Sequence, residues 1–273
     1  MELQENLQLK YEQLKEHIAM LENVAVAFSG GIDSTLLLKV AHDILGDKAM
    51  ALTVFGPFVP QREKQESLEY CKTEGITHKI CEVSVEKIEQ FAENPVNRCY
   101  YCKKVLFGQM LKLAQEEQVP YLLEGSNLDD MGDYRPGMQA IAELGIISPL
   151  KEAGFTKADV RTLAKYLGIP FWNKPSYACL ASRFPYGETI TVEKLKRTEL
   201  AEDYLIGKGF VQMRVRNHGD MARIELTAEQ IGLLWDENLR MEINGYFKSL
   251  GFTYVTLDLQ GFRSGSMNET LMH

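Results

Sequence analysis

Near the N-terminus, leucine and isoleucine recur at helical spacing among charged residues, which predicts an amphipathic helix of roughly twenty residues. Its apolar positions are Leu7, Leu14, Ile18 and Leu21. Five apolar runs with strand character follow, with helical patterns between them, at 24–28, 49–55, 78–83, 120–126 and 145–150. Strands that alternate with helices predict an α/β unit whose sheet is mostly parallel and buried.

The pattern changes in the last third of the chain. A helical segment at about 192–207 leads into two strand-like runs around the turn sequence NHGD at 217–220, which predicts a β-hairpin. A further helical segment has Thr227 and Gln230 spaced as a capping box, and a last strand, YVTLDL, follows it. We therefore expect two domains, residues 1–185 and a small α+β domain at 186–273.

The bulk composition limits the classes of function. The chain has 273 residues and a net charge of −8, which argues against binding nucleic acid through its overall field, although a local basic groove stays compatible with these numbers. There is no run of 18 apolar residues, so an ordinary membrane helix is not expected. The polar, acidic N-terminus resembles neither a signal nor a transit peptide, and we expect a cytoplasmic protein without a membrane partner.

The string FSGGIDST lies between the first predicted strand and a predicted helix. Gly30 and Gly31 permit a backbone in which several N–H groups point at one anion, and the helix adds the positive end of its dipole. Ser29, Ser34 and Thr35 add hydroxyl donors. The Gly-Lys-Ser/Thr ending of a kinase or GTPase loop and the GxGxxG of a dinucleotide loop are both missing. An ordinary tight turn is the alternative to a phosphate site.

The five cysteines are an odd number, which disfavours a disulfide framework. Cys71 and Cys81 fall within a helix and a strand pattern and are interpreted as buried filler. Cys99 and Cys102 form a CxxC, and Cys179 lies in the loop KPSYACLASRFPYG. Three thiolates that converge can hold a 4Fe-4S cluster and leave one iron free of protein ligands. Zinc is the competing metal, but a structural zinc site requires a fourth ligand.

In the predicted hairpin, the period of two places Gln212, Arg214 and Arg216 on one face of the sheet. Arg223 and Glu225 alternate with apolar residues on the facing strand. A face with three arginines suits a substrate phosphate or carboxylate, which guanidinium groups hold by paired hydrogen bonds. The alternative is a solvated face with cross-strand salt bridges.

SGGIDS resembles the SGGxDS loop of the ATP-dependent PP-loop enzymes, which adenylate a substrate oxygen and release pyrophosphate. The resemblance implies a parallel-sheet domain similar to the adenine nucleotide alpha hydrolases, in which Asp33 helps to hold Mg²⁺. It also implies that a second loop, EGSNLDDMGDYRPG, lies near the ATP; the alternative is a polar turn with Asn127 or Asp129 as a helix cap. The implied ligands of ATP and pyrophosphate are Ser29, Gly30, Gly31, Asp33, Ser34, Ser126, Asn127, Asp130 and Arg135.

The full set of motifs resembles the LarE family of ATP-dependent sulfur transferases, through AFSGGIDSTLL, GSNLDD, KPSYACLASRFPYG, RVR, ARIE and GFRSGSMN. The resemblance implies that the carboxylates of pyridinium-3,5-biscarboxylic acid mononucleotide are adenylated and converted to thiocarboxylates for a nickel-pincer nucleotide cofactor. In one branch of the family a cysteine at the place of Cys179 gives up its own sulfur. In the other branch three cysteines bind a 4Fe-4S cluster, and Cys99, Cys102 and Cys179 together match that branch.

The resemblance also implies roles for individual residues and for partners. Cys179, Asp33 and Ser34 would be catalytic, and the GFRSGSMN tail is expected to close over the substrate. The implied substrate contacts are Ser182, Arg183, Arg214, Arg216 and Glu225. A homo-oligomer, a hexamer in this family, is expected, and the sequence does not identify the sulfide donor. A PP-loop tRNA thiolase with a three-cysteine cluster is the alternative, against which the net charge counts.

Overall fold

The computed structural model describes residues 3–131, 136–174, 178–263 and 265–271. The chain divides into two compact units. Unit 1 consists of Met1–Gly56, Gln61–Glu89 and Asn97–Tyr177, and unit 2 of Pro57–Pro60, Gln90–Val96 and Ala178–His273. The main division therefore lies earlier in the chain than residue 185, and two short segments from the first half of the chain belong to unit 2.

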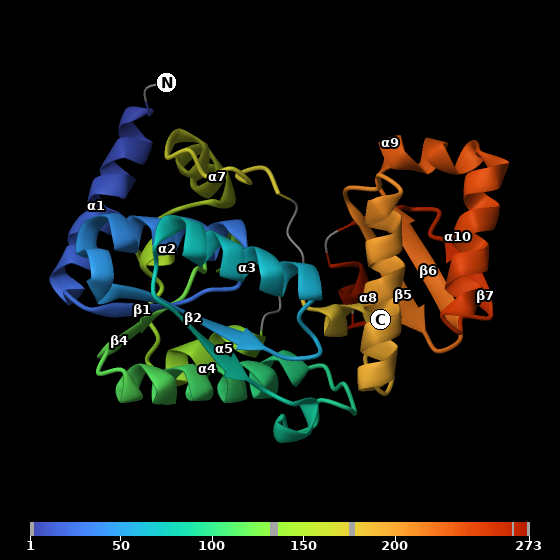
Figure 1. Ribbon diagram of the computed structural model, residues 1–273, viewed down its shortest axis with the longest axis horizontal. Coiled ribbons are helices and arrows are strands. Elements are labelled where there is room, and N and C mark those ends of the chain that lie inside the picture. The colour runs from blue at the N-terminus through green and yellow to red at the C-terminus, as the bar shows by residue number, and fades with distance from the viewer. Residues whose placement is uncertain (1–2, 132–135, 175–177, 264, 272–273) are drawn as a thin grey trace. The chain divides into compact units, whose positions relative to one another are not determined.

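Unit 1 is built on a four-stranded parallel sheet in the order β3-β2-β1-β4 (Figure 1). Its strands are β1 (Val24–Ala27), β2 (Ala49–Phe55), β3 (His78–Glu82) and β4 (Tyr121–Leu123). The α/β class with a mostly parallel sheet is confirmed. The chain adds strands on one side of β1 and then crosses to β4 on the other, so the topological switch point lies between the carboxyl ends of β1 and β4.

The fifth predicted strand, at 145–150, is wrong. This run makes one isolated bridge, Leu123 to Ile147, and Pro149 then begins the short helix α6 (Pro149–Glu152). Proline has no N–H for a sheet ladder, and its fixed φ angle suits the first turn of a helix. An apolar run that contains Pro149 therefore ends as a helix rather than as an edge strand.

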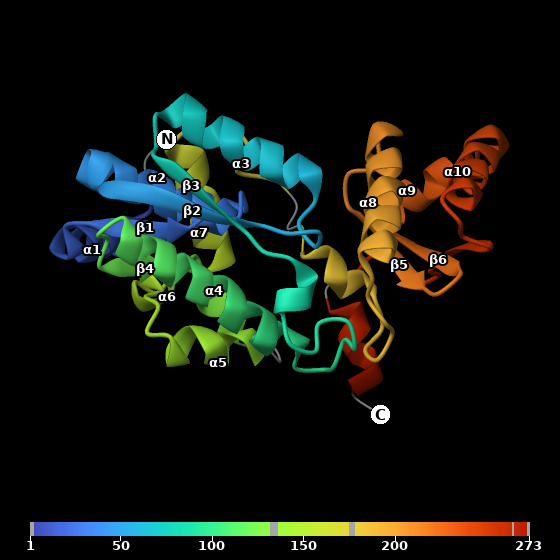
Figure 2. The ribbon, with the colours of Figure 1, turned by 60° about the horizontal axis from the view of Figure 1, so that its bottom comes forward.

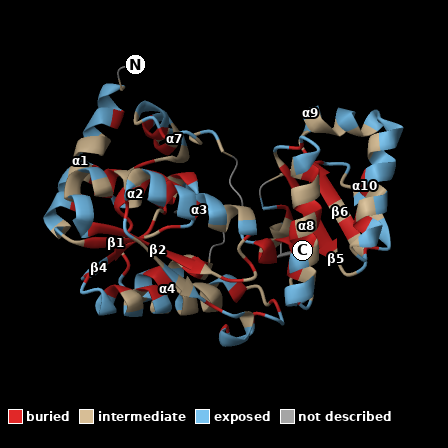
Figure 3. Ribbon diagram, viewed as in Figure 1, coloured by how far each residue is buried: buried red, intermediate tan, exposed pale blue. Residues whose placement is uncertain are grey.

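Helices cover both faces of this sheet, which Figure 2 shows between the two layers. One layer contains α1 (Glu5–Leu21), α2 (Ile32–Leu45), α3 (Gln61–Glu74) and α7 (Lys157–Tyr166). The other layer contains α4 (Arg98–Glu116) and α5 (Pro136–Glu143). Strands β1 and β2 are buried between the layers (Figure 3), which is why their sequences are apolar at nearly every position.

The amphipathic helix predicted near the N-terminus is confirmed, and the structure shows a capping box at the start of another helix of unit 1. Leu7, Leu14 and Ile18 of α1 are buried in the core of the unit. Thr156 and Asp159 form a reciprocal capping box at the start of α7. Burial by itself raises the pKa of Asp159, but its hydrogen bonds to Lys10 and Thr156 outweigh burial and hold the pKa below its ordinary value.

Unit 2 contains the three-stranded sheet β5-β6-β7. The predicted hairpin is confirmed: β5 (Met213–His218) and β6 (Met221–Leu226) are antiparallel, and β7 (Tyr254–Leu257) lies parallel to β6. The helices are α8 (Val192–Gly207), α9 (Ala228–Ile231) and α10 (Glu237–Ser249). Their apolar sides and the sheet enclose a separate core that includes Leu205, Phe210, Val215, Ile224 and Phe247.

The single helix expected after residue 227 is instead α9, a 3-10 turn (Gly232–Trp235) and α10. In the described part of the chain, Thr227 makes no side-chain capping bond, so the capping box with Gln230 is wrong. Gln230 Oε1 accepts a hydrogen bond from the Gln212 amide of the hairpin at 3.3 Å, and Asp236 caps α10. A contact with a segment distant in sequence thus replaces the expected local one.

The remaining regular segments are 3-10 helices at Gly46–Lys48, Val85–Lys87, Leu128–Met131, Leu180–Arg183 and Ser266–Leu271. Two of them carry residues of the candidate site, the turn after β4 and the turn after Cys179. Among the described residues, none of the helices is both long enough and apolar enough to cross a membrane.

Candidate active site

The phosphate loop connects β1 to α2 at the topological switch point. Gly30 has a φ angle of +73°, a left-handed conformation that favours glycine. Gly31 is the N-cap of α2, and it has no side chain with which to cap the first amides of the helix. These amides and the helix dipole are therefore available to an anion.

Hydroxyl groups hold this loop in shape. Ser29 Oγ and Ser34 Oγ are 3.1 Å apart, and the hydroxyls of Ser34 and Thr35 both donate to the carbonyl of Gly31, at 3.0 and 2.8 Å. From β2, the hydroxyl of Thr53 donates to the Phe28 carbonyl at 2.7 Å, which fixes the end of β1. Only Ser29 and Gly31 in this group are exposed, and the Gly31 amide donates to Ser29 Oγ at 3.4 Å.

Asp33 joins this loop to the second predicted loop, which follows β4. Asn127 Nδ2 donates to Asp33 Oδ1 at 3.0 Å, across 94 positions of sequence. Asn127 Oδ1 accepts the Asp129 amide at 3.0 Å and Asp130 accepts the Asn127 amide at 3.0 Å, so Asn127 also serves as the turn cap that we considered as the alternative. The structure thus brings Ser29, Asp33, Ser34, Asn127 and Asp130 together within unit 1.

Two further residues of the second loop, Ser126 and Arg135, were predicted to lie near ATP. Ser126 is buried, and its hydroxyl donates to Glu124 Oε2 at 2.8 Å, so Glu124 orients this side chain. Glu124 also accepts a hydrogen bond from Ser148. The fourth predicted residue of this loop, Arg135, lies outside the described residues.

Lys157 is a site residue that the sequence reasoning missed. Its ammonium group forms an ion pair with Asp33 Oδ2, and its backbone amide donates to Asp129 at 2.8 Å. Lys157 occupies the first position of α7, where the helix dipole disfavours a positive charge. That unfavourable position is the signal in the sequence that could have indicated a partner elsewhere in the unit.

The three cysteines of the predicted cluster are all accessible to some degree. Cys99 is exposed and Cys102 is half-buried, both in the first turns of α4 in unit 1, and Cys179 is exposed in unit 2. Arg98 Nη2 lies 3.9 Å from Cys99 Sγ, and a helix N-terminus favours negatively charged groups. Among the residues that the structure describes, no group of three His, Cys, Asp or Glu side chains is placed to hold a metal ion.

The other two cysteines differ from these three. Cys71 is buried in the core, and burial raises its pKa to about 12. Cys81 is half-buried, and burial again raises its pKa. The interpretation of Cys71 as core filler is confirmed, whereas Cys81, which was also predicted to be buried, is only half-buried, as Cys102 is.

The segment that carries Cys179 also contains Ser182 and Arg183, two of the predicted substrate contacts. Arg183 is fully buried and forms a bidentate ion pair with Glu202 of α8, with both nitrogen–oxygen distances at 2.9 Å. Burial by itself raises the pKa of Glu202, but the charge and hydrogen bonds of Arg183, with Arg214 and the Val215 amide, hold that pKa below its ordinary value. Ser182 Oγ accepts a hydrogen bond from Arg183 at 2.9 Å.

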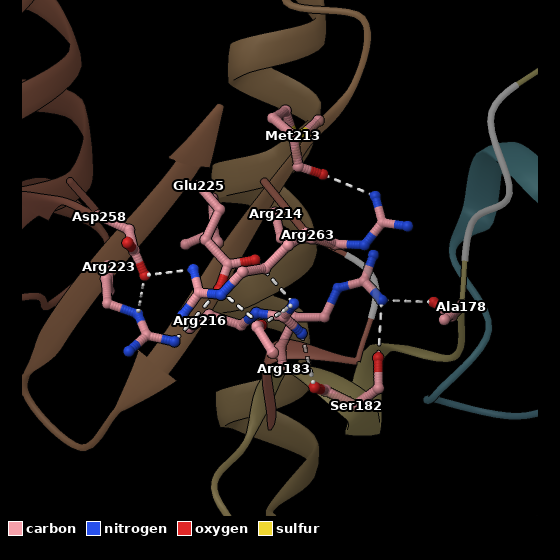
Figure 4. A network of polar contacts seen from close by, with 12 residues as sticks. Ala178, Ser182, Arg183, Met213, Arg214, Arg216, Arg223, Glu225, Asp258 and Arg263 are labelled. Atoms are coloured by element: carbon pink, nitrogen blue, oxygen red, sulfur yellow. Dashed lines mark hydrogen bonds and ion pairs between the residues drawn. The ribbon is translucent and has the colours of Figure 1, made fainter. Parts of the chain in front are cut away.

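The arginine face of the hairpin is a buried charge network, drawn in Figure 4. Arg214 and Arg216 are each 5% exposed and Glu225 is fully buried, so the alternative of a solvated face is wrong for these residues. Arg216 donates to Glu225 at 2.7 Å and to the Ser182 carbonyl at 3.0 Å. Arg223, which is half-buried, donates to the second oxygen of Glu225 at 3.1 Å.

The C-terminal segment contacts this network, and its closure over the substrate stays a prediction. Ser266 Oγ donates to Glu225 at 2.9 Å and accepts from Arg216 at 2.8 Å. The Phe262 ring centroid is 5.0 Å from the guanidinium carbon of Arg214, and Arg263 pairs with Asp258 at 3.3 Å. The tail therefore completes the surroundings of both arginines within unit 2.

Comparison with known proteins shows which family has this combination of features. No family model matches the chain. The chain is 43% identical, over 97% of its length and 99% of the relative, to an uncharacterized protein of Synechocystis. It is 27% identical over 55% of its length to one of the subunits of a glutamine-hydrolysing GMP synthase of Saccharolobus solfataricus, and it covers 44% of that subunit.

A third relative carries a more specific name. The chain is 41% identical to the pyridinium-3,5-bisthiocarboxylic acid mononucleotide synthase of Lactiplantibacillus plantarum, over 92% of this chain and 91% of that enzyme. A match over 92% of the chain extends into both units. The chain therefore belongs to the LarE family of pyridinium-3,5-bisthiocarboxylic acid mononucleotide synthases.

Proposed function

We propose that this protein is an ATP-dependent sulfur transferase that converts the carboxylates of pyridinium-3,5-biscarboxylic acid mononucleotide to thiocarboxylates. The observation that carries the proposal is the 41% identity to a synthase of the bisthiocarboxylic acid product over 92% of the chain. The phosphate loop of unit 1 and the buried arginines of unit 2 support the proposal, because ATP and a nucleotide dicarboxylate would each need a site for anions.

The first half of the reaction is activation of a carboxylate. A substrate carboxylate oxygen attacks the α-phosphorus of ATP, the bond to the bridging oxygen breaks, and pyrophosphate leaves. We assign Ser29, Gly30, Gly31 and Ser34 to the pyrophosphate, because the open amides of α2 lie there. The carboxylate of Asp33 suits Mg²⁺, a hard cation that prefers oxygen ligands. Asn127 and Asp130, with Ser126 and Arg135, are assigned to the rest of the nucleotide.

Lys157 adds a positive charge to this half-reaction. Its ion pair with Asp33 neutralises the carboxylate when no cation is present. If Asp33 held Mg²⁺, the Lys157 ammonium would no longer be needed to neutralise that carboxylate and would be available to stabilise negative charge on the phosphates. Positioning and charge neutralisation then account for activation, and a carboxylate nucleophile needs no general base.

The second half of the reaction delivers sulfur. A sulfide attacks the acyl carbon of the adenylate, AMP leaves with the carboxylate oxygen, and a thiocarboxylate remains. We propose that Cys99, Cys102 and Cys179 hold a 4Fe-4S cluster, because all three are accessible thiols, unlike Cys71. Such a cluster, when bound, supplies an iron without a protein ligand that can carry exogenous sulfide.

The substrate anions are assigned to the arginine face of unit 2. Arg214, Arg216 and Glu225 form its buried centre, with Ser182 beside them. The Nε atom of Arg216 is buried and has no hydrogen-bond partner among the described residues. A buried donor without a partner is costly, and a phosphate or carboxylate oxygen of the substrate would satisfy it.

The direct test is anaerobic reconstitution with iron and sulfide, followed by incubation with ATP, sulfide and the dicarboxylate mononucleotide. Mass spectrometry should show sulfur in place of oxygen on the small molecule, with AMP and pyrophosphate released and Cys179 intact over repeated turnovers. Failure to release pyrophosphate with this acid contradicts the proposed function. Dehydroalanine at position 179 after one turnover contradicts the cluster and assigns the sulfur to the protein itself.

The cluster assignment has its own matched pair of variants. Cys99→Ser should abolish iron binding and thiolation, whereas Cys81→Ser should retain both, because Cys81 is half-buried in β3 and belongs to no proposed site. Equal iron content in the two variants contradicts the cluster. Thiolation of bulk tRNA by the reconstituted protein would favour the tRNA thiolase instead.

A further inference from the structure

The guanidinium group of Arg183 is buried in unit 2 and bonds residues of that unit. Its Nε and Nη2 atoms donate to the two oxygens of Glu202, each at 2.9 Å. Its Nη1 donates to the carbonyls of Ala178 at 2.6 Å and Cys179 at 3.2 Å, and to Ser182 Oγ (Figure 4). All three nitrogens of a fully buried side chain are therefore engaged.

These bonds hold the backbone on both sides of an exposed thiol. The Cys179 carbonyl also accepts the Ser182 amide at 2.9 Å, and the Leu180 amide donates to the Phe58 carbonyl at 3.0 Å. Arg216 donates to the Ser182 carbonyl at 3.0 Å. The Cys179 side chain is exposed although its own backbone is fixed by these contacts.

Glu202, the ion-pair partner of Arg183, is itself held in place by the core of unit 2. It is fully buried in α8, and its Oε1 also accepts the Val215 amide of β5 at 3.1 Å. A helix and a strand of the unit 2 core therefore anchor the carboxylate that anchors Arg183. Stability alone does not explain such a pair, because well-packed apolar residues of similar size are often at least as stabilising. A bidentate ion pair differs from them in fixing orientation.

We infer that the buried Arg183–Glu202 pair is a positioning device for Cys179, and that Arg183 acts through the backbone of residues 178–182 rather than by contact with the substrate. The inference rests on the proposed function for the task of Cys179, as a ligand or as a sulfur donor. In either task the sulfur must occupy a defined position when the adenylate reacts, because a misplacement of about 1 Å costs roughly 100-fold in rate.

The test compares Arg183→Lys with Arg197→Lys in the cluster-free protein. Arg197 extends from α8 and, like Arg183, bonds two backbone carbonyls, those of Gly219 at 2.6 Å and Gly251 at 3.2 Å, so its replacement is a matched loss of carbonyl anchors. The readout is the rate of maleimide labelling of Cys179 divided by that of Cys99, measured by peptide mass spectrometry. Because both thiols are exposed, Cys99 is an internal control for reagent and pH.

Arg183→Lys should raise the labelling ratio at least threefold, since lysine keeps the charge opposite Glu202 but cannot reach the same carbonyls. Arg197→Lys should lower the melting temperature without changing the ratio. In the reconstituted enzyme, Arg183→Lys should lower kcat at least tenfold with KM within twofold. The labelling experiment does not require an active enzyme. A negative labelling result therefore contradicts the positioning role of Arg183 without contradicting the proposed function.

An unchanged ratio in folded Arg183→Lys overturns the inference, and so does an equal rise in Arg197→Lys. If Arg183→Lys does not fold, the double variant Arg183→Met, Glu202→Leu removes both charges of the pair together and should show the same rise. Hydrogen exchange in the unaltered protein is a further measurement that depends on no variant. The amides of Leu180 and Ser182 should exchange as slowly as those of β5, and exchange within seconds would overturn the inference.

Discussion

Replacing Gly125 with alanine should destabilise unit 1 and weaken its binding of ATP at the same time. Gly125 lies where the chain leaving β4 passes the start of α2. A Cβ atom there would lie 2.9 Å from Ser34 N, 3.1 Å from the Asp33 carbonyl carbon and 3.2 Å from Ser34 Cα. These are backbone atoms, so no side-chain rotation relieves the contact, and the loop and the first turn of α2 must move apart.

The loss of stability expected for Gly125→Ala follows from the usual cost of overpacking. Overpacking of this kind costs about 1–3 kcal/mol, and each kcal/mol lowers the melting temperature of a unit of this size by about 2–4 °C. The melting temperature of unit 1 should therefore fall by roughly 2–12 °C. Since the displaced residues include Asp33 and Ser34, the affinity for Mg·ATP should fall by about tenfold or more, which is a loss of about 1.4 kcal/mol.

Gly108→Ala is the matched control. Among the described residues, no atom lies within 4 Å of a Cβ built at Gly108, which is inside α4. Alanine is favoured over glycine in a helix interior by about 0.5–1 kcal/mol, so this variant should be slightly more stable and should bind ATP like the parent. Calorimetry measures the change in melting temperature, and titration with Mg·ATP measures the change in affinity. Parent-like stability and affinity in Gly125→Ala would refute the reasoning, as would equal losses in the two variants.

Three further outcomes are expected. Lys157→Met should reduce pyrophosphate release at least tenfold, measured by a coupled phosphate assay, and a parent-like rate would remove this lysine from the site. Asp159→Asn should lower the free energy of unfolding by about 1 kcal/mol at neutral pH, because the carboxylate that accepts hydrogen bonds from Thr156 at the start of α7 is lost. Because the folded pKa of Asp159 is lowered from 3.8, its contribution is present above that value and is lost as the pH falls through the lower folded value, so acid unfolding curves of parent and variant should converge. Ser266→Ala should cost about 1–3 kcal/mol in unit 2, since Arg216 loses a buried partner, and denaturant unfolding of that unit checks it.

Local signals in the sequence determined much of the fold. The β1–loop–α2 order, the capping box of α7 and the turn at 217–220 all depend on residues within a few positions of one another. Each of them is stabilised by hydrogen bonds that close over short distances, so the sequence pattern and the structure agree there. The phosphate loop belongs to this class, because the strand, the glycines and the helix are consecutive.

Other features required contacts between distant parts of the chain. The run at 145–150 has the composition of a strand, but Pro149 turns it into a helix after one bridge to Leu123. Gln230 bonds the hairpin rather than its own helix. The Gln230 side chain could bond its own helix or the hairpin, and the surroundings supplied by the rest of the unit decided between them. At 145–150 the deciding residue is Pro149 itself, a local signal that the strand prediction overlooked.

The candidate site also has features that the sequence determined and features that only the tertiary structure decided. By itself, the sequence determined the residue types, namely the phosphate loop, three separated cysteines and alternating arginines. Only the tertiary structure decided which charges meet, since Lys157 reaches Asp33 across 124 positions and Arg183 reaches Glu202 inside the core of unit 2. A buried charge requires a partner, but which residue becomes the partner depends on how the elements pack and not on spacing along the chain. The periodicity of β5 could therefore identify a charged face of the sheet without showing that this face is buried.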